Sequence, residues 1–174
     1  PLWLAARDPA SFDFAMKEGM HIMSTPLSKP LAEVENLAVK LRTALLDNPG
    51  VRRPRWMVLK AVGVARQARD LDAIVAANHN HARRFEGLFS TQGNVVNGFP
   101  QIHHTGSAAS GAHDDAALRE SMVLGDPDGV VEQLRAYAAL GVDEFCYAGS
   151  YGLDPQRTIR SLELFVERVM PAFD

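Results

Sequence analysis

At the centre of the chain lies Trp56-Met57-Val58-Leu59-Lys60-Ala61-Val62-Gly63-Val64-Ala65, an apolar run rich in β-branched residues that begins shortly after Pro54. Such a run, bounded by a proline, predicts a β-strand. Before it, apolar residues recur every three or four positions from Leu31 to Leu45, as on the buried face of an amphipathic helix. After it, a long helical stretch is predicted from about Arg66 to Phe89. The middle of the chain is therefore predicted to be a helix–strand–helix unit.

The N-terminal part of the chain repeats this alternation. Pro1 to Ala6 predicts a first strand, and Asp8-Pro9 predicts a helix start, because Asp caps the first turn and proline loses no hydrogen bond there. Gly19 ends that helix. His21 to Thr25 is mostly apolar, and Pro26 prevents a helix from running through it, so a second strand is predicted. Because a soluble domain rarely opens on a buried strand, we expect further structure before Pro1.

The C-terminal part uses the same helix start twice, at Asp126-Pro127 and at Asp154-Pro155. Between these helices, Val142 to Ala148 predicts a fourth strand. Strands that alternate with helices form right-handed βαβ units around a parallel sheet, an α/β fold. Such a sheet is either an open doubly wound layer or half of a TIM (β/α)8 barrel, and a complete barrel needs about 250 residues.

Residues 90–118 do not fit the alternation. They are rich in Gly, Asn, Ser and Ala and show no sustained period. A long segment of this kind is typical of a lid or a disordered excursion. We therefore predict a single domain, or part of one, over residues 1–174, with a long mobile loop at 90–118.

The composition is that of a globular domain, with 47% hydrophobic and 22% charged residues. The formal net charge of −3 argues against a general nucleic-acid binder, and Arg52-Arg53-Pro54-Arg55 is predicted to be a solvated loop. Cys146 is the single cysteine, which rules out a disulfide within the chain and predicts an inert buried thiol. No apolar run approaches the ~20 residues of a membrane span. We therefore expect a cytoplasmic protein without membrane contact.

Ligands of both architectures bind at the carboxyl ends of the strands. After the first predicted strand, the helix N-terminus offers N–H groups, Ser11 a hydroxyl and Arg7 a cation, a set that suits a phosphate. Asp8 would repel such an anion unless its carboxylate caps the helix. A simple N-cap without any ligand is the alternative interpretation.

Two further strand ends carry candidate binding residues. Gly149 and Ser150, followed by Tyr151, offer close backbone approach, a hydroxyl and a flat stacking face. Ser24-Thr25-Pro26 is the other candidate, and a tight turn explains either segment equally well. The six histidines form no set with a cysteine or carboxylate at metal-ligand spacing, so no metal site is predicted.

Several segments together resemble the luciferase-like flavin-dependent monooxygenases. They are the strand and helix start over Pro1 to Pro9, then Gly125-Asp126-Pro127, Leu140-Gly141-Val142-Asp143 and the closing block from Arg160 to Phe173. The likeness covers almost the whole chain, but only the carboxyl-terminal half of a family member. It implies that the four strands are the last four of a (β/α)8 barrel and that residues 90–118 lie near the family's flexible active-site loop.

The resemblance implies an oxidoreductase that uses reduced FMN and O2 to oxygenate a small organic substrate, with a flavin reductase as the partner that supplies the reduced cofactor. A related branch uses the deazaflavin F420 for hydride transfer. In the family, the segment after the first strand contacts the flavin phosphate, and this carries over to Arg7, Asp8 and Ser11. Asp8 replaces a usual Ser or Thr, which implies a capping role. Gly149 and Ser150 complete the predicted cofactor-binding set.

The resemblance also places part of the barrel outside this chain. Catalytic residues stay unassigned, because the strands that carry much of the flavin pocket would precede Pro1. Four strands alone leave two open parallel edges, which proteins rarely expose. We therefore expect a homo-oligomer that covers these edges, or a chain that is part of a longer protein. The rival interpretation is a non-catalytic, flavin-binding or structural half-barrel.

Overall fold

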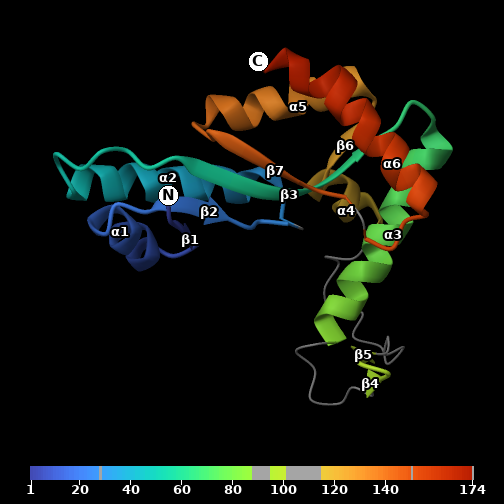
Figure 1. Cartoon of the computed structure of the whole chain (residues 1–174), viewed down its shortest axis with the longest axis horizontal. Coiled ribbons are helices and arrows are strands. Elements are labelled where there is room, and N and C mark those ends of the chain that lie inside the picture. The colour runs from blue at the N-terminus through green and yellow to red at the C-terminus, as the bar shows by residue number, and fades with distance from the viewer. Residues whose placement is uncertain (28, 88–94, 101–114, 150, 174) are drawn as a thin grey trace.

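The chain folds around one parallel sheet, seen in a computed structural model that describes residues 1–27, 29–87, 95–100, 115–149 and 151–173 (Figure 1). The sheet has five strands, and helices connect them in the order expected of an α/β fold. Its strands are β1 (Trp3–Ala5), β2 (His21–Ser24), β3 (Trp56–Val64), β6 (Val123–Gly125) and β7 (Glu144–Ala148).

Three of the helices begin at the predicted Asp-Pro pairs. The carboxylates of Asp8, Asp126 and Asp154 each accept a backbone N–H of the first turn at 2.8–3.1 Å, which satisfies donors that have no partner within the helix. The helices are α1 (Pro9–Lys17), α2 (Leu31–Asp47), α3 (Ala68–Gly87), α4 (Asp115–Ser121), α5 (Pro127–Ala139) and α6 (Pro155–Leu164), the last followed by a π-helical turn (Phe165–Val169) and a 3₁₀ turn (Met170–Ala172).

Strand β3 is the centre of the sheet. Its residue Val58 is paired with Ser24 of β2 and with Phe145 of β7, so these two strands lie on opposite edges of β3. Strand β1 extends the sheet beyond β2, and all of these pairs are parallel. The outer edges of β1 and β7 have no strand partner among the described residues.

The sequence predicted four strands in this sheet, and the structure corrects that number to five. The additional strand, β6, has only three residues and pairs in parallel with Val62–Val64 of β3. The side-chain amide of Gln133 on α5 pairs with Leu124, accepting its N–H at 3.2 Å and donating to its C=O at 2.9 Å. These tertiary bonds define β6, so the local sequence pattern carries almost no signal for it.

Residues 90–118, predicted to be a mobile loop, include short regular elements that the sequence did not predict. Val95–Val96 (β4) and Phe99–Pro100 (β5) form an antiparallel hairpin, and Asn97 and Gly98 between them both have positive φ. Asn-Gly at the centre of a two-residue loop is a strong hairpin signal that the sequence analysis missed. Helix α4 already begins at Asp115. The remainder of the predicted loop lies outside the described residues.

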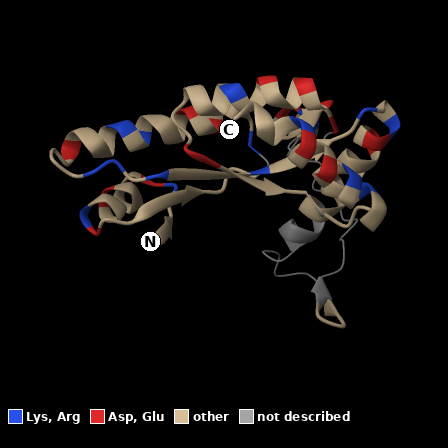
Figure 2. Ribbon diagram, turned by 45° about the horizontal axis from the view of Figure 1, so that its top comes forward, with Lys and Arg blue, Asp and Glu red and all other residues tan. Residues whose placement is uncertain are grey.

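The two faces of the sheet are covered differently. Helices α1, α2 and α5 cover one face, packing their apolar stripes against residues such as Ile22, Trp56 and Val58. On the other face, a row in register across four strands, Ala5–Met23–Met57–Glu144, is only partly buried or exposed. Acidic and basic positions are interspersed over the outer helices (Figure 2). One sheet face therefore forms the core, and the opposite face is open along its first half.

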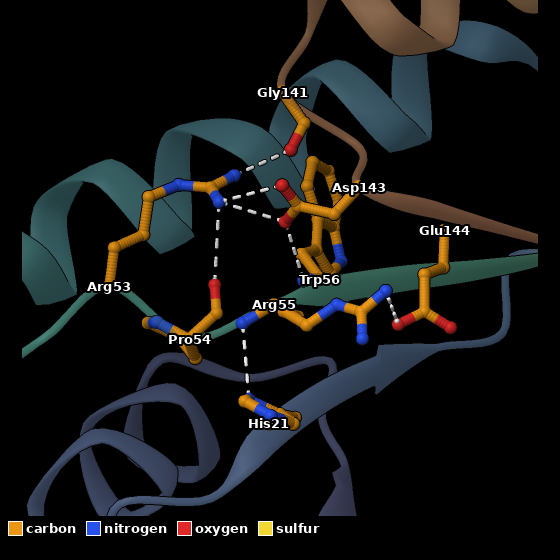
Figure 3. Close-up of polar contacts among 8 residues, drawn as sticks. All are labelled: His21, Arg53, Pro54, Arg55, Trp56, Gly141, Asp143 and Glu144. Atoms are coloured by element: carbon orange, nitrogen blue, oxygen red, sulfur yellow. Dashed lines mark hydrogen bonds and ion pairs between the residues drawn. The ribbon is translucent and has the colours of Figure 1, made fainter. Parts of the chain in front are cut away.

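Asp143 fastens the beginnings of β3 and β7 together (Figure 3). Its carboxylate accepts two bonds from Nη1 of Arg53, at 2.9 and 2.8 Å, and the backbone N–H of Trp56 at 2.8 Å. Nη2 of Arg53 donates to the carbonyl of Gly141 at 2.6 Å. The neighbouring strand start is held by an ion pair between Arg55 and Glu144 at 2.7 Å. Two of the three arginines in the segment predicted to be a solvated loop therefore form ion pairs.

Asp143→Asn should lower the free energy of unfolding by about 1–2 kcal/mol, because charge-assisted bonds to Arg53 and Trp56 are weakened while the side-chain shape is kept. Urea unfolding followed by tryptophan fluorescence measures this loss. Asp128→Asn is the matched control, because Asp128 is exposed in the first turn of α5; its effect should stay within about 0.5 kcal/mol. Equal effects of the two substitutions would show that the Asp143 contacts do not stabilise the sheet.

Candidate functional site

The carboxyl ends of β1 and β2 and the first residue of β3, Trp56, meet around the buried hydroxyl of Ser24. This hydroxyl donates to the carbonyl of Ala6 at 2.9 Å and accepts the indole N–H of Trp56 at 3.1 Å. Ser24 has no exposed surface. The hydroxyl proposed from the Ser24-Thr25-Pro26 segment therefore serves the sheet itself and faces the helices rather than the solvent.

Asp8 and Ser11 form a closed cap at the start of α1. Oδ1 of Asp8 accepts the backbone N–H of Ser11 at 2.9 Å, and Oδ2 accepts its hydroxyl at 2.7 Å. The side-chain bond from Ser11, followed by the backbone bond, lowers the pKa of Asp8 below its ordinary value, and the carboxylate is exposed. The capping role expected of Asp8 matches this geometry. The Ser11 hydroxyl donates its hydrogen bond to Asp8, so only its oxygen lone pairs are left to accept a bond.

Arg7 places a cation beside this cap. Its side chain is 55% exposed, and one guanidinium nitrogen lies 3.6 Å from a carboxylate oxygen of Glu33 on α2. The backbone carbonyl of Arg7 accepts the ammonium of Lys40 at 2.8 Å. The sequence analysis missed Lys40, since only the packing of α1 against α2 brings it to the β1–α1 connection. Two cations, Arg7 and Lys40, therefore lie at the β1–α1 connection, and Glu33 partly neutralises Arg7.

Gly149 makes room for a neighbouring ring. A Cβ at this position would lie 2.2 Å from the ring of Tyr147. The Tyr147 hydroxyl is 3.0 Å from the Oγ of Ser161 on α6, and that Oγ accepts the backbone N–H of Val64 at 2.8 Å. Burial raises the pKa of Tyr147, against the opposing effect of the bond to Ser161. Gly149 thus has a packing role here, and Ser150 lies outside the described residues.

Lys60 is a buried cation on the helix-covered face of β3. It has no exposed surface, and its Nζ donates to the carbonyls of Lys29 and Ser121, each at 2.5 Å. Burial lowers the pKa of Lys60 to about 8. The side chain therefore joins the loop after β2 to the end of α4, and no sequence pattern predicted this role.

Two other kinds of site are absent from the described residues. No group of three or more His, Cys, Asp or Glu side chains in the described segments is placed to hold a metal ion. Over the same segments, none of the helices is both long enough and apolar enough to cross a membrane. Cys146 lies partly buried on β7 and is a free thiol.

Parallel βα units with polar groups at the carboxyl ends of the strands occur in doubly wound sheets and in TIM barrels. The chain belongs to the luciferase-like monooxygenase family, whose model matches residues 1–144. It is 33% identical over 176 residues to the oxygenase component of a flavin-dependent trigonelline monooxygenase from Acinetobacter baylyi, covering 99% of this chain and 48% of that protein. The chain thus spans about half the length of this curated relative.

Solved structures show the same relation in three dimensions. An F420-dependent secondary alcohol dehydrogenase superposes with a TM-score of 0.64 at 16% identity, covering 100% of this chain and 49% of the other. The oxygenating constituent of 3,6-diketocamphane monooxygenase from Pseudomonas putida, in complex with FMN, gives 0.62 at 18% identity, covering 97% and 47%. The prediction of half a (β/α)8 barrel is confirmed by these matches.

Gly149→Ala should lower the free energy of unfolding by about 1–3 kcal/mol, because the new methyl group overlaps the ring of Tyr147. The double variant with Tyr147→Leu should lose less than the sum of the two single losses, since the smaller side chain leaves room for the methyl group. Urea unfolding of the four proteins in the cycle measures the coupling. Additive losses would contradict a packing role for Gly149.

Lys60→Met should change how stability depends on pH. Because the native pKa of Lys60 is about 8 and the ordinary value is 10.5, the unfolded chain binds more protons between these values. The stability that Lys60 contributes is then present above the upper value and is lost as the pH falls through about 8. Between pH 7 and 10, the wild type should gain about 2 kcal/mol relative to the variant.

Chemical unfolding of both proteins at several pH values tests this. Lys17→Met is the control, because Lys17 is exposed and pairs only with Asp13 in its own helix; it should show no such pH-dependent difference over the same range. A constant difference between wild type and Lys60→Met would contradict burial of the ammonium.

Proposed function

We propose that this chain contributes to a flavin-dependent monooxygenase that oxygenates a small organic molecule with reduced FMN and O2. The observation that carries this is family membership over residues 1–144 together with 33% identity to a flavin-dependent oxygenase component. The deazaflavin alternative rests on a structural neighbour at 16% identity, a level at which only the fold is shared. The 33% identical relative is flavin-dependent, which favours a flavin over a deazaflavin, and FMN is the flavin that we propose.

The β1–α1 connection is the proposed contact with the cofactor phosphate. The guanidinium of Arg7 is half exposed and the N-terminus of α1 adds a partial positive charge, so the groups present fit an anion. Asp8 holds the helix start in place through Ser11, and Ser11 offers its oxygen lone pairs. Gly149 and Ser150 remain part of the proposed cofactor-binding set at the end of β7.

When bound, reduced FMN supplies the electrons with which O2 is activated. The chain's own residues then have a binding and shielding role: Arg7 orients the phosphate, and the partly buried Met23 and Met57 of the open sheet face offer an apolar surface that excludes water. Groups that contact the substrate are proposed to come from outside this chain, because the described strand ends present no acid–base pair.

Further partners follow from the same proposal. The matched relative is named as an oxygenase component, which supports a flavin reductase as the source of reduced cofactor.

A homo-oligomer is supported by the open edges of β1 and β7. It is also supported by an apolar stripe on α6 and the turn after it, which is about half exposed and is formed by Ile159, Leu162 and Val166. The free cysteine suits a reducing compartment, and we propose the cytoplasm.

Titration of the purified protein with FMN and with riboflavin, followed by flavin fluorescence, tests the proposal. FMN should bind about tenfold or more tightly than riboflavin, because only FMN carries the phosphate that Arg7 meets. Arg7→Gln should reduce that ratio toward one, while Arg42→Gln, at an exposed position on α2, should leave it unchanged. Equal affinity for both ligands, or no saturable flavin binding, would overturn the proposed site.

A further inference from the structure

A cavity lies away from the β1–α1 connection, between the start of α3 and α6, which lie side by side beyond the end of β3 (Figure 1). Its volume is about 180 Å³, and its lining is mostly apolar, with Val64, Ala65, Ile74 and Leu164 forming the floor. Val64 and Ile74 are almost fully buried, so this floor belongs to the rigid core.

Arginines surround the mouth of this cavity. Arg66, Arg157 and Arg160 line it directly, and a wider polar hollow beside it, of about 460 Å³, shares Arg157 and Arg160 and adds Arg69. Two carboxylates face the same space. Asp70 lies 3.4 Å from the guanidinium of Arg157, and Asp154 accepts backbone N–H groups of its own helix at 3.0 and 3.1 Å.

Three of these four guanidinium groups have no partner among the described residues. Arg66, Arg69 and Arg160 make no ion pair or hydrogen bond with any residue that the structure describes. Exposed arginines are often simply solvated, but Arg66, just before α3, and Arg160, on α6, line the same apolar cavity. Positive charge at the mouth and apolar surface at the floor suit a ligand with a negative head and an apolar body.

The size of the cavity limits that ligand. An apolar cavity of about 150 Å³ accommodates benzene, so the space here holds one six-membered ring and little more. We propose that this cavity binds a small aromatic carboxylate, with the ring against Val64, Ile74 and Leu164 and the carboxylate between Arg66 and Arg160. The proposal does not depend on flavin binding, because none of these residues belongs to the β1–α1 connection.

Benzoate is the probe, titrated into flavin-free protein by isothermal calorimetry. Binding should saturate with a Kd in the millimolar range, as befits a ligand of so few heavy atoms. Benzyl alcohol, which keeps the ring and lacks the charge, should bind about tenfold or more weakly. Rising salt should weaken benzoate binding and leave that of benzyl alcohol unchanged, because only an ionic contact is screened.

The double variant Arg66→Gln with Arg160→Gln should weaken benzoate binding about tenfold or more. The matched control is Arg42→Gln with Arg135→Gln, which removes the same charge from exposed positions on α2 and α5. Circular dichroism should confirm that both double variants fold, because all four side chains are exposed.

The proposal is overturned if benzoate does not bind, if benzyl alcohol binds equally well, or if both variants weaken binding equally. Flavin titration of the same proteins separates this outcome from the fate of the proposed monooxygenase function.

Discussion

The structure depends on the pairing of one strand, β3, with three others. At Val58, β3 is paired with β2 on one edge and with β7 on the other, and the last three residues of β3 pair with β6. The strand is anchored at both ends by side chains from other elements: Asp143 accepts the N–H of Trp56, and Ser161 accepts that of Val64. Because buried backbone donors must be satisfied, these two residues fix where β3 begins and ends. The strand ends that carry the candidate site take their positions from it.

Local signals in the sequence predicted most of the elements. The three Asp-Pro pairs cap helices as expected, because a cap depends on residues only two or three positions apart. Strand β3 was predictable because its run is long and apolar. In contrast, β6 has three residues, and its existence depends on Val62–Val64 and on Gln133, which are distant in sequence. The Asn97-Gly98 hairpin was a local signal that was outweighed by the polar composition around it.

The candidate site was predictable to a smaller extent. The sequence indicated Arg7, Asp8 and Ser11 because they follow a strand and open a helix, and the structure places all three together at that point. For Gly149 the structure shows a packing reason that the sequence did not indicate, because the missing side chain accommodates Tyr147. The predicted cofactor contact of Gly149 stays a prediction. The buried contacts of Lys60 and the arginine-lined cavity were not predictable, because both depend on residues that only the folded chain brings together. Lys60 contacts carbonyls 31 and 61 residues away, which no spacing rule encodes.

The open face of the sheet supports the proposal that this chain holds part of a site. In a closed barrel, side chains of alternate positions point inward and fill the interior in layers. Here that inward set includes Met23, Met57 and Leu59, all only partly buried, while the opposite positions of the same strands lie in the core under helices. Surface of this kind is stable only when another layer covers it. The matched relative is about twice as long as the part that this chain matches. We therefore propose that further barrel strands cover this face and bring their own carboxyl ends to the same mouth. Under this proposal, a cofactor at the mouth would be contacted from both sides, so its phosphate and its ring need not be bound by the same half.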